Sequence, residues 1–558
     1  MKKLLISGLI VSSVFLGSCG GGGGGSSSGT SGGSGSSGGT DGGTGGGTTA
    51  TPTYLAYVLD YTKSYTPYLD YQDSLYLVDP SNPSSIVSIS KFPIIDNGSL
   101  LVFGNYNSQN YSYTDLHVHE IYYIEEIDAD TTTINGGLLK KISMVKGSST
   151  PTPVQVSNLG NVCNIIFREK DAINKKTYMQ LKTAGPDGKC HTSDDEFYFV
   201  NSTMGISDKA IPLKGKSVIA SLGGYLLNSG IGSVYSRIGG YLLNLSITGF
   251  LVYNKNNSTI EKCDLNLNNC TPIESGALSV NYIASNPNNG EVFLCVNGNL
   301  KRFNGTSLNG TSANCDTTWN YYNDNQAIYA VDNNKNILKF PYIGSNWQTI
   351  YNGGYVLSSI YMTKNYLIFE DTNNNLNNLK VLKKDGTSLI NIYTFNKNEA
   401  DTGIGIYTTS NKFLITIINN STQKACVWEE GTTSLTCEDN AYWAGVSIAP
   451  NGTLDVSITF PFPAYKILKV ENVTSVLGGT LYAIDPSNLN SKINLGNVPT
   501  AYDILFTLGL GDNILLRCLE NSFPLQFDVF FTNISQFNSL KQITNTPDKV
   551  ELSLNFWY

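Results

Sequence analysis

Two stretches far apart in the chain decide the expected fold: LYLVDPSN at residues 75–82 and LYAIDPSN at residues 481–488. Each has an apolar run that ends in an acidic residue, followed by a Pro-Ser turn and the start of a second run. A looser copy, IYAVDN, stands at residues 328–333. Strand–turn–strand units that recur along one chain indicate repeated antiparallel sheets.

The rest of the chain after residue 52 has the same character. Short apolar or alternating runs are separated by clusters of Asn, Asp, Gly and Pro, and no long stretch has a convincing helical period. The turn DNNKN at residues 332–336 suits a tight hairpin, because asparagine tolerates the left-handed backbone that such turns need. With 41% hydrophobic and 11% aromatic residues, the chain can fill a large core. We therefore expect one all-β domain over residues 53–558.

Repeats that each form an antiparallel sheet favour a β-propeller. The length suits seven or eight blades of about 60–70 residues each, long loops included. Two architectures compete with it. A tandem of β-sandwiches fits the same strand pattern, and the alternating, aromatic segment VELSLNFWY at residues 550–558 is of the kind found in outer-membrane barrels. Many runs are continuously apolar rather than alternating, which argues against the barrel. The sandwiches stay open as the alternative, and we expect the propeller.

Motifs near the C-terminus resemble a known propeller family. FDVFFTN at residues 527–533, followed by LKQITNTP at residues 540–547, is similar to the repeat of TolB-type propellers. SIAPNG at residues 447–452 is similar to the S-P-D-G turn of those repeats. The Asp-Pro-Ser-Asn units resemble blades of quinoprotein-like propellers instead, so the subfamily stays open. The resemblance implies a propeller. It suggests TolB-type proteins and the propeller lipoprotein of the outer-membrane assembly machinery as precedents for a binding module.

The first residues have the order of a secretory signal peptide. Lys2 and Lys3 precede a short apolar run that ends in Leu-Gly-Ser-Cys, with Cys19 last. The run is shorter than the roughly 20 residues that a membrane-spanning helix needs. The Leu-Gly-Ser-Cys segment resembles the bacterial lipobox. This resemblance implies a lipoprotein signal peptide over residues 1–18 and a Cys19 that carries lipid, palmitate included.

A flexible linker is expected to follow over residues 19–52. After Cys19 it contains almost only Gly, Ser and Thr, so it has no side chains with which to build a core. A glycine-rich coil of about 30 residues reaches roughly 30 Å, enough to hold a domain clear of a membrane. Glycine directly after Cys19 resembles lipoproteins sorted to the outer membrane. We therefore expect a lipid-anchored, extracytoplasmic protein of the bacterial outer membrane or cell surface.

The cysteines beyond Cys19 predict disulfides. Apart from Cys518, which stands in an apolar run and is expected to be a buried thiol, they form close pairs along the chain. Close pairs in an exported protein favour disulfides within hairpins or between adjoining strands, although spacing alone leaves the connectivity open. The absence of a C-x-x-C pair argues against zinc. The candidate pairs are Cys163 with Cys190, Cys263 with Cys270, Cys295 with Cys315, and Cys426 with Cys437.

The segment GPDGKCHTSDDE, residues 185–196, is the sharpest candidate for a ligand site. Its carboxylates, on Asp187, Asp194, Asp195 and Glu196, are oxygen ligands of the kind that Ca²⁺ prefers. The spacing does not match the EF-hand. We favour the alternative, a solvated hairpin turn held by a disulfide between Cys190 and Cys163.

Histidines and tyrosines give two weaker candidates. His117 and His119 stand on one face of a strand, since side chains alternate along it, but a third metal ligand is not apparent and an exposed strand surface is preferred. Tyr-rich segments at residues 54–57 and 65–71 could present rings for stacking on sugars or proteins, although most tyrosines are expected to pack between blades.

The net charge and the absence of catalytic motifs limit the classes of function that the sequence supports. A net charge of −8 does not attract phosphate backbones, so we expect no nucleic-acid partner. H-E-x-x-H is absent, G-x-S-x-G occurs only in the linker, and three histidines leave few bases for a Ser-His-Asp triad. We expect no cofactor other than calcium. The expected function is a membrane-anchored binding or scaffolding module for a protein, peptide or glycan. The alternative is a secreted carbohydrate-active or other hydrolase or lyase on the same scaffold, with a carboxylate pair distant in sequence.

Overall fold

The computed structural model describes residues 54–557 with gaps, of which the longer are 62–73, 92–100, 127–135, 144–151, 224–246, 448–453 and 456–465. Every regular element in the described residues is a β-strand. No described helix is long and apolar enough to cross a membrane. The expected signal peptide and linker, residues 1–18 and 19–52, lie outside the described residues, and these boundaries stay predictions. The fold class is all-β, as the sequence predicted.

Six of the sheets contain four or five antiparallel strands that follow one another along the chain. They are the sheets β12–β15 (Lys216–Leu222, Gly249–Asn254, Thr259–Cys263, Cys270–Ser275), β16–β19 (Val280–Ser285, Val292–Val296, Asn299–Phe303, Leu308–Asn314), β20–β23 (Asn320–Asn323, Ala327–Val331, Ile337–Pro341, Gln348–Tyr351), β24–β28 (Tyr355–Val356, Tyr361–Met362, Tyr366–Asn373, Leu376–Lys383, Leu389–Thr394), β29–β32 (Glu399–Tyr407, Lys412–Asn419, Thr422–Glu429, Thr436–Asp439), and β33 with β35–β37 (Tyr442–Ser447, Lys466–Glu471, Gly479–Asp485, Asn488–Val498).

The remaining strands form one 17-stranded sheet that divides into four units of the same kind. Only isolated residue pairs, such as Gly137 with Val162, join one unit to the next. The short strand β34 (Leu454–Asp455) pairs with β5 and belongs to no unit. The units are β42 with β1–β3 (Lys549–Trp557, Tyr54–Tyr61, Ser74–Asp79, Asn82–Ser88), β4–β7 (Leu101–Asn107, Ser112–Glu126, Gly137–Ser143, Val154–Gln155), β8–β11 (Val162–Asp171, Lys176–Thr183, Glu196–Asn201, Ile211–Pro212) and β38–β41 (Tyr502–Leu510, Asn513–Glu520, Gln526–Asn533, Lys541–Gln542).

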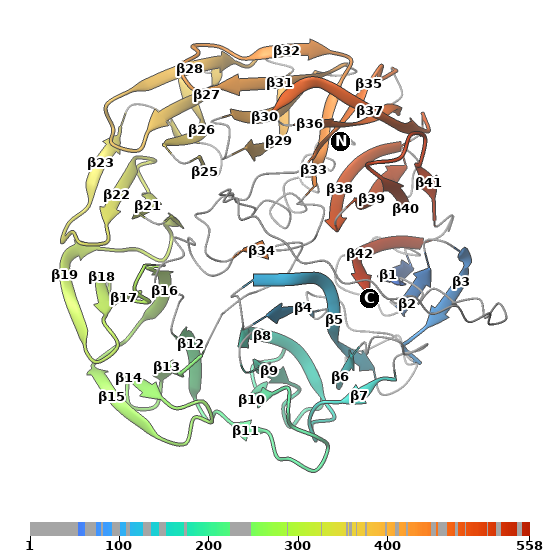
Figure 1. The fold of residues 1–558 in the computed structure, drawn as a ribbon. Helices are drawn as coiled ribbons and strands as arrows, with labels where there is room; N and C mark the ends of the chain where they lie inside the picture. The colour runs from blue at the N-terminus through green and yellow to red at the C-terminus, as the bar shows by residue number, and fades with distance from the viewer. Residues whose placement is uncertain are drawn as a thin grey trace, which may run out of the picture.

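These ten units of described strands stand around a ring (Figure 1), which makes the fold a β-propeller. Within their blades, β12, β16 and β29 lie nearest the centre, and β15, β19 and β32 lie at the rim. We number the blades along the chain, from blade 1 (β42 and β1–β3) to blade 10 (β38–β41). The expected number of seven or eight blades is too low. That expectation assumed about 60–70 residues per blade, whereas blade 5 runs from residue 280 to 314 and blade 6 from residue 320 to 351.

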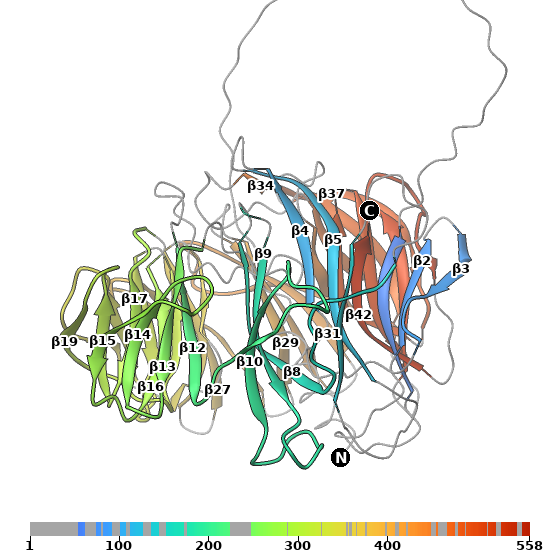
Figure 2. The same cartoon turned by 90° about the horizontal axis from the view of Figure 1, so that it is seen from below.

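Blade 1 joins the two ends of the described chain. The last strand, β42, is antiparallel to β1, with Tyr54 opposite Trp557 and Tyr61 opposite Lys549. Figure 2, turned by 90°, shows the strands running between the two faces of the ring. The alternating C-terminal segment therefore supplies the strand that completes blade 1.

The core lies between neighbouring blades. In β21 every residue is buried, and successive side chains face opposite neighbours. Ile328 packs with Phe293 of blade 5, whereas Tyr329 packs with Leu367 of blade 7. A strand that is buried on both faces needs an uninterrupted apolar sequence, whereas a strand buried on one face alternates apolar and polar residues. This explains the continuous apolar runs in the sequence.

The repeated LYLVDPSN and LYAIDPSN stretches occupy equivalent places. The first forms the β2–β3 hairpin, with Asp79 opposite Asn82, and the second forms the β36–β37 hairpin, with Asp485 opposite Asn488. Both are the two outer strands of their blades. The looser copy at residues 328–333 begins on β21 instead, which is one strand further inward in its blade. This copy is therefore similar in sequence but does not occupy an equivalent position.

Candidate functional site

The acidic segment at residues 185–196 connects β9 to β10 in blade 3. The hairpin is in register at Thr183 and Glu196. Gly185 is needed for the loop to close, because a Cβ atom there would lie 2.2 Å from the backbone oxygen of Asp194. Gly188 adopts a φ of +72°, and its N–H donates to the Gly185 carbonyl at 2.9 Å.

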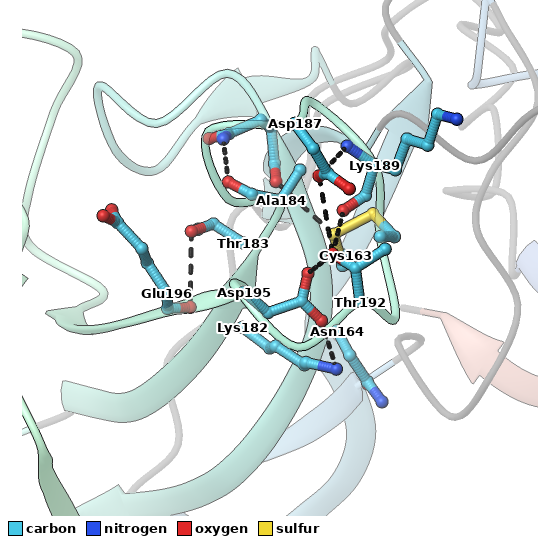
Figure 3. Close-up of a disulfide and its surroundings, with 12 residues drawn as sticks. Cys163, Asn164, Lys182, Thr183, Ala184, Asp187, Lys189, Thr192, Asp195 and Glu196 are labelled. Atoms are coloured by element: carbon cyan, nitrogen blue, oxygen red, sulfur yellow. Dashed lines mark hydrogen bonds and ion pairs between the residues drawn. A yellow bond between two sulfur atoms is a disulfide. The ribbon is translucent and has the colours of Figure 1, made fainter.

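Three of the four predicted carboxylates lie around one hydroxyl, that of Thr192. Figure 3 shows two of them, Asp187 and Asp195, beside this hydroxyl. Thr192 Oγ1 lies 2.6 Å from Asp194 Oδ1, 3.2 Å from Asp195 Oδ1 and 3.4 Å from Asp187 Oδ1. A hydroxyl has one proton to donate, so the shortest contact, with Asp194, is the strongest. Hydrogen bonds from Thr192 and from the backbone N–H of Asp187 hold the pKa of the Asp194 carboxyl below its usual value.

Two of the four carboxylates, those of Asp195 and Glu196, have protein partners other than Thr192. The Lys182 ammonium forms an ion pair with Asp195, whose side chain is almost fully buried. Glu196 points away from Asp195 (Figure 3), and its Oε2 accepts a hydrogen bond of 2.7 Å from the Tyr198 hydroxyl. The four residues are thus not arranged around a common point. This geometry fits the hairpin turn that the sequence favoured, and calcium binding stays an untested prediction.

The described residues bring three potential metal ligands close together at one place, which is in blade 4 and not in the acidic loop. Glu261, Cys263 and Cys270 have ligand atoms within 4.8 Å of one another. The two sulfur atoms, however, form a disulfide and offer no thiolate. Glu261 is instead held by Lys216 at 2.7 Å and by the Asn254 amide at 2.9 Å.

All four disulfides join the pairs that chain spacing suggested. Cys263–Cys270 and Cys426–Cys437 connect residues directly opposite on adjacent strands, with Cα atoms 4.1 and 4.0 Å apart. Cys163 of β8 reaches the acidic loop at Cys190, and Cys295 of β17 joins Cys315 after β19. Each bond stays within one blade or its own loop. Cys518 lies buried in β39.

Three further candidates lie where the structure describes no side chains. His117 and His119 lie in β5, whose described side chains begin at Ile121. Cys19 lies outside the described residues. The rings at residues 65–71 also lie outside them, so the stacking hypothesis for that segment is untested.

An aromatic cluster in blade 6 was not singled out from the sequence. The ring centroids of Trp319 and Trp347 lie 6.0 Å apart, and Tyr321 lies 6.1 Å from Trp319 and 6.4 Å from Trp347. All three side chains are half-buried. The signal available in the sequence was two of only five tryptophans, in segments rich in Asn, Ser and Thr.

A buried polar network between blades 6 and 7 was also missed. Lys380 Nζ lies 2.7 Å from Asp371 Oδ2 and 3.0 Å from the hydroxyl of Tyr351, which in turn donates to Asp371. Burial and the hydrogen bond to Asp371 raise the pKa of Tyr351. Burial opposes the charge of Lys380, but its hydrogen bonds with Asp371 and Tyr351 prevail and raise its pKa. The network is closed to solvent, which favours a structural role over a catalytic one.

A second buried ion pair crosses the same interface. Lys384, after β27, reaches Asp324, in the turn before β21, with 2.5 Å between Nζ and Oδ2. Burial lowers the pKa of Lys384 despite this partner. Two buried cations therefore link blades 6 and 7.

Comparisons with known proteins add no functional identity. No protein family matches the chain, and no curated protein matches it. Solved structures give weak similarity. A candidate 6-phosphogluconolactonase from Bacteroides fragilis matches at 9% identity and a TM-score of 0.27, over 92% of this chain and 99% of its own. A prolyl endopeptidase matches at 7% and 0.28, over 86% and 54%. The tricorn protease matches at 10% and 0.26, over 89% and 48%. At these scores no activity can be transferred.

Proposed function

We propose that the chain is a lipid-anchored, extracytoplasmic binding protein whose propeller presents a ligand-binding surface. The observation that carries the proposal is the set of four disulfides in the propeller. Disulfides of this kind persist in oxidising compartments outside the cytoplasm. The signal-type segment that ends at Cys19 would deliver the chain to such a compartment.

The proposed anchor and the propeller complement each other. A lipid on Cys19 holds one end of the chain at the outer membrane or cell surface, and the Gly/Ser/Thr linker lets the propeller stand clear of that membrane. A ring of ten blades gives two broad faces and a rim lined by loops and edge strands. Such surfaces suit recognition of a protein, peptide or glycan.

The anchor is tested by replacing Cys19 with alanine. The full chain and Cys19→Ala are expressed in a two-membraned bacterium, labelled with radioactive palmitate and separated into membrane and soluble fractions. We expect the wild type to be labelled and membrane-bound, and Cys19→Ala to be unlabelled and soluble. A matched control is Cys518→Ala, which removes a buried cysteine that belongs to none of the four disulfides. If Cys19→Ala stays with the membrane, the proposed anchor is wrong.

A further inference from the structure

The two faces of the ring contain different connections between strands. Because the strands of a blade alternate in direction, the connections from the first to the second strand and from the third to the fourth lie on one face. In blade 3, the N–H of Ser202 after β10 donates to the carbonyl of Thr177 near the start of β9 at 2.8 Å. We call this face the entry face, because β1 starts there. Leu55 lies opposite Val78, beside the hairpin of Asp79–Asn82.

Most of the exposed apolar side chains lie on the entry face. Within the described residues, nine large apolar side chains are exposed, and five of them lie at a connection from the third to the fourth strand. Ile343 and Phe537 are the most exposed of the five, at 97% and 76%. The five are Val154 (blade 2), Ile206 (blade 3), Ile343 (blade 6), Leu389 (blade 7) and Phe537 (blade 10), whereas Phe197, Leu278 and Leu376 lie at the opposite face and Ile166 lies within β8.

The five side chains do not form one patch. They belong to blades 2 and 3, blades 6 and 7, and blade 10, which stand at three separate places around the ring (Figure 1). A protein ligand usually covers one continuous patch with an apolar centre. Apolar contacts at separate points of one face fit a broad, flat partner instead, and a lipid bilayer is such a partner.

The connections on the entry face also carry little charge. In blades 5, 6, 9 and 10, the residues between the third and fourth strands, 304–307, 342–347, 486–487 and 534–540, contain no Asp, Glu, Lys or Arg. The opposite face includes the acidic loop of blade 3, with Asp187, Asp194 and Asp195. Because charged side chains are costly to bring into lipid, the entry face suits contact with a membrane better than the opposite face does.

We propose that the entry face contacts the lipid surface to which Cys19 is anchored, so that the opposite face is the one presented to a ligand. Tyr54 follows Cys19 by 35 residues. A flexible coil of this length has an r.m.s. reach of about 30 Å. The linker therefore keeps the entry face at a high effective concentration near lipid, and a few exposed apolar side chains suffice for contact. This inference rests on the proposed anchor and adds the orientation of the propeller.

The test measures how close each face comes to lipid. The full lipidated chain is reconstituted in vesicles of phosphatidylcholine and phosphatidylethanolamine, some of whose acyl chains carry a nitroxide quencher. A bimane fluorophore is attached to Ile343→Cys, Phe537→Cys or, as the control on the opposite face, Leu278→Cys. All three positions are exposed, and the free thiol of Cys518 is buried. We expect the nitroxide to quench the first two labels several fold more than the third.

Charged substitutions give a second measurement. Ile206→Asp with Leu389→Asp, added to the labelled Phe537→Cys protein, should reduce the quenching, because carboxylates oppose contact with lipid. Leu376→Asp, on the opposite face, is the matched control and should leave the quenching unchanged.

Three results would overturn the inference. They are equal quenching of all three labels, no quenching in a protein that stays on the vesicles, and quenching that the two aspartates leave unchanged. Failure of the palmitate test of Cys19 would overturn the anchor and this orientation together. Absence of quenching in a palmitate-labelled, vesicle-bound protein would overturn the orientation alone, so the two failures are distinguishable.

Discussion

At the scale of single residues, the acidic loop of blade 3 depends on Thr192. Its hydroxyl is the nearest donor to Asp194 and also approaches Asp187 and Asp195. Thr192→Val keeps the shape of the side chain and removes the donor. We expect the pKa of Asp194 to rise toward its ordinary value in this variant, because the largest cause of its depression is the bond from Thr192. Carboxyl carbon NMR titration measures the change.

The sign of the pH dependence follows from the direction of that shift. A carboxyl whose folded pKa is lowered contributes stability above its unfolded pKa and loses it as the pH falls through the folded pKa. Thr192→Val should therefore lose this contribution at a higher pH than the wild type. Ser193→Ala, an exposed neighbouring hydroxyl, is the control. An unchanged Asp194 titration in Thr192→Val would contradict the assignment. Calcium should leave the wild-type titration unchanged, and a further lowering of the Asp194 pKa would instead favour a cation site.

The sequence predicted the grouping of the carboxylates in this loop only in part. The sequence named Asp187, Asp194, Asp195 and Glu196 as one group, and the structure separates Glu196 from the others because side chains alternate where β10 begins. The aromatic cluster of blade 6 had only a weak signal in the sequence, two of the five tryptophans in polar segments. Trp319 and Trp347 belong to different connections, and they meet only after the strands of blade 6 pair and pack on blade 5.

At the scale of elements, the disulfides differ in what they constrain. Cys163–Cys190 closes a sequence separation of 27 residues and Cys263–Cys270 one of 7. Loop-closure entropy then gives about 3.6 kcal/mol for the longer and about 2.5 kcal/mol for the shorter. We expect Cys163→Ala with Cys190→Ala to destabilise the protein more than Cys263→Ala with Cys270→Ala. Urea unfolding under non-reducing conditions measures both. A larger loss for the shorter loop would show that strand pairing, and not chain entropy, sets the contribution.

The hairpins were the elements most open to prediction. Residues 75–82 and 481–488 carry the same Asp-Pro-Ser-Asn signal and form equivalent hairpins, because the turn residues fix the register of the flanking strands. The number of blades was not open to the same argument. A continuously apolar strand such as β21 and a hairpin strand such as β36 look alike in sequence, so the repeats did not fix the length of a blade. The expected number of blades therefore depended on an assumed length of about 60–70 residues per blade.

At the scale of the whole molecule, each blade is stabilised by its neighbours. Core clusters are shared between consecutive blades, as where Ile328 and Tyr329 of one strand face blades 5 and 7. A four-stranded sheet of this size buries too little surface to be stable alone. The stability of the ring therefore depends on the interfaces between neighbouring blades. Blades 6 and 7 add to their apolar contacts the buried network of Tyr351, Asp371 and Lys380.

The last prediction concerns that network. Asp371→Asn leaves the Lys380 ammonium without its carboxylate in a buried interface, which should cost about 3–5 kcal/mol of unfolding free energy. Replacing both partners, Asp371→Leu with Lys380→Met, should recover much of the loss, because it removes both buried charges. Urea unfolding measures the three proteins.

A matched comparison separates burial from charge. Lys301 and Glu274 form an ion pair of 2.6 Å between blades 4 and 5, and about a fifth of each side chain is exposed. Glu274→Gln should cost about 1 kcal/mol or less, since water screens a pair that is open to solvent. If Asp371→Asn costs no more than Glu274→Gln, the buried network does not hold blades 6 and 7 together. The stability of that interface then comes from Tyr329, Leu367 and their apolar neighbours, with the ion pair of Lys384 and Asp324.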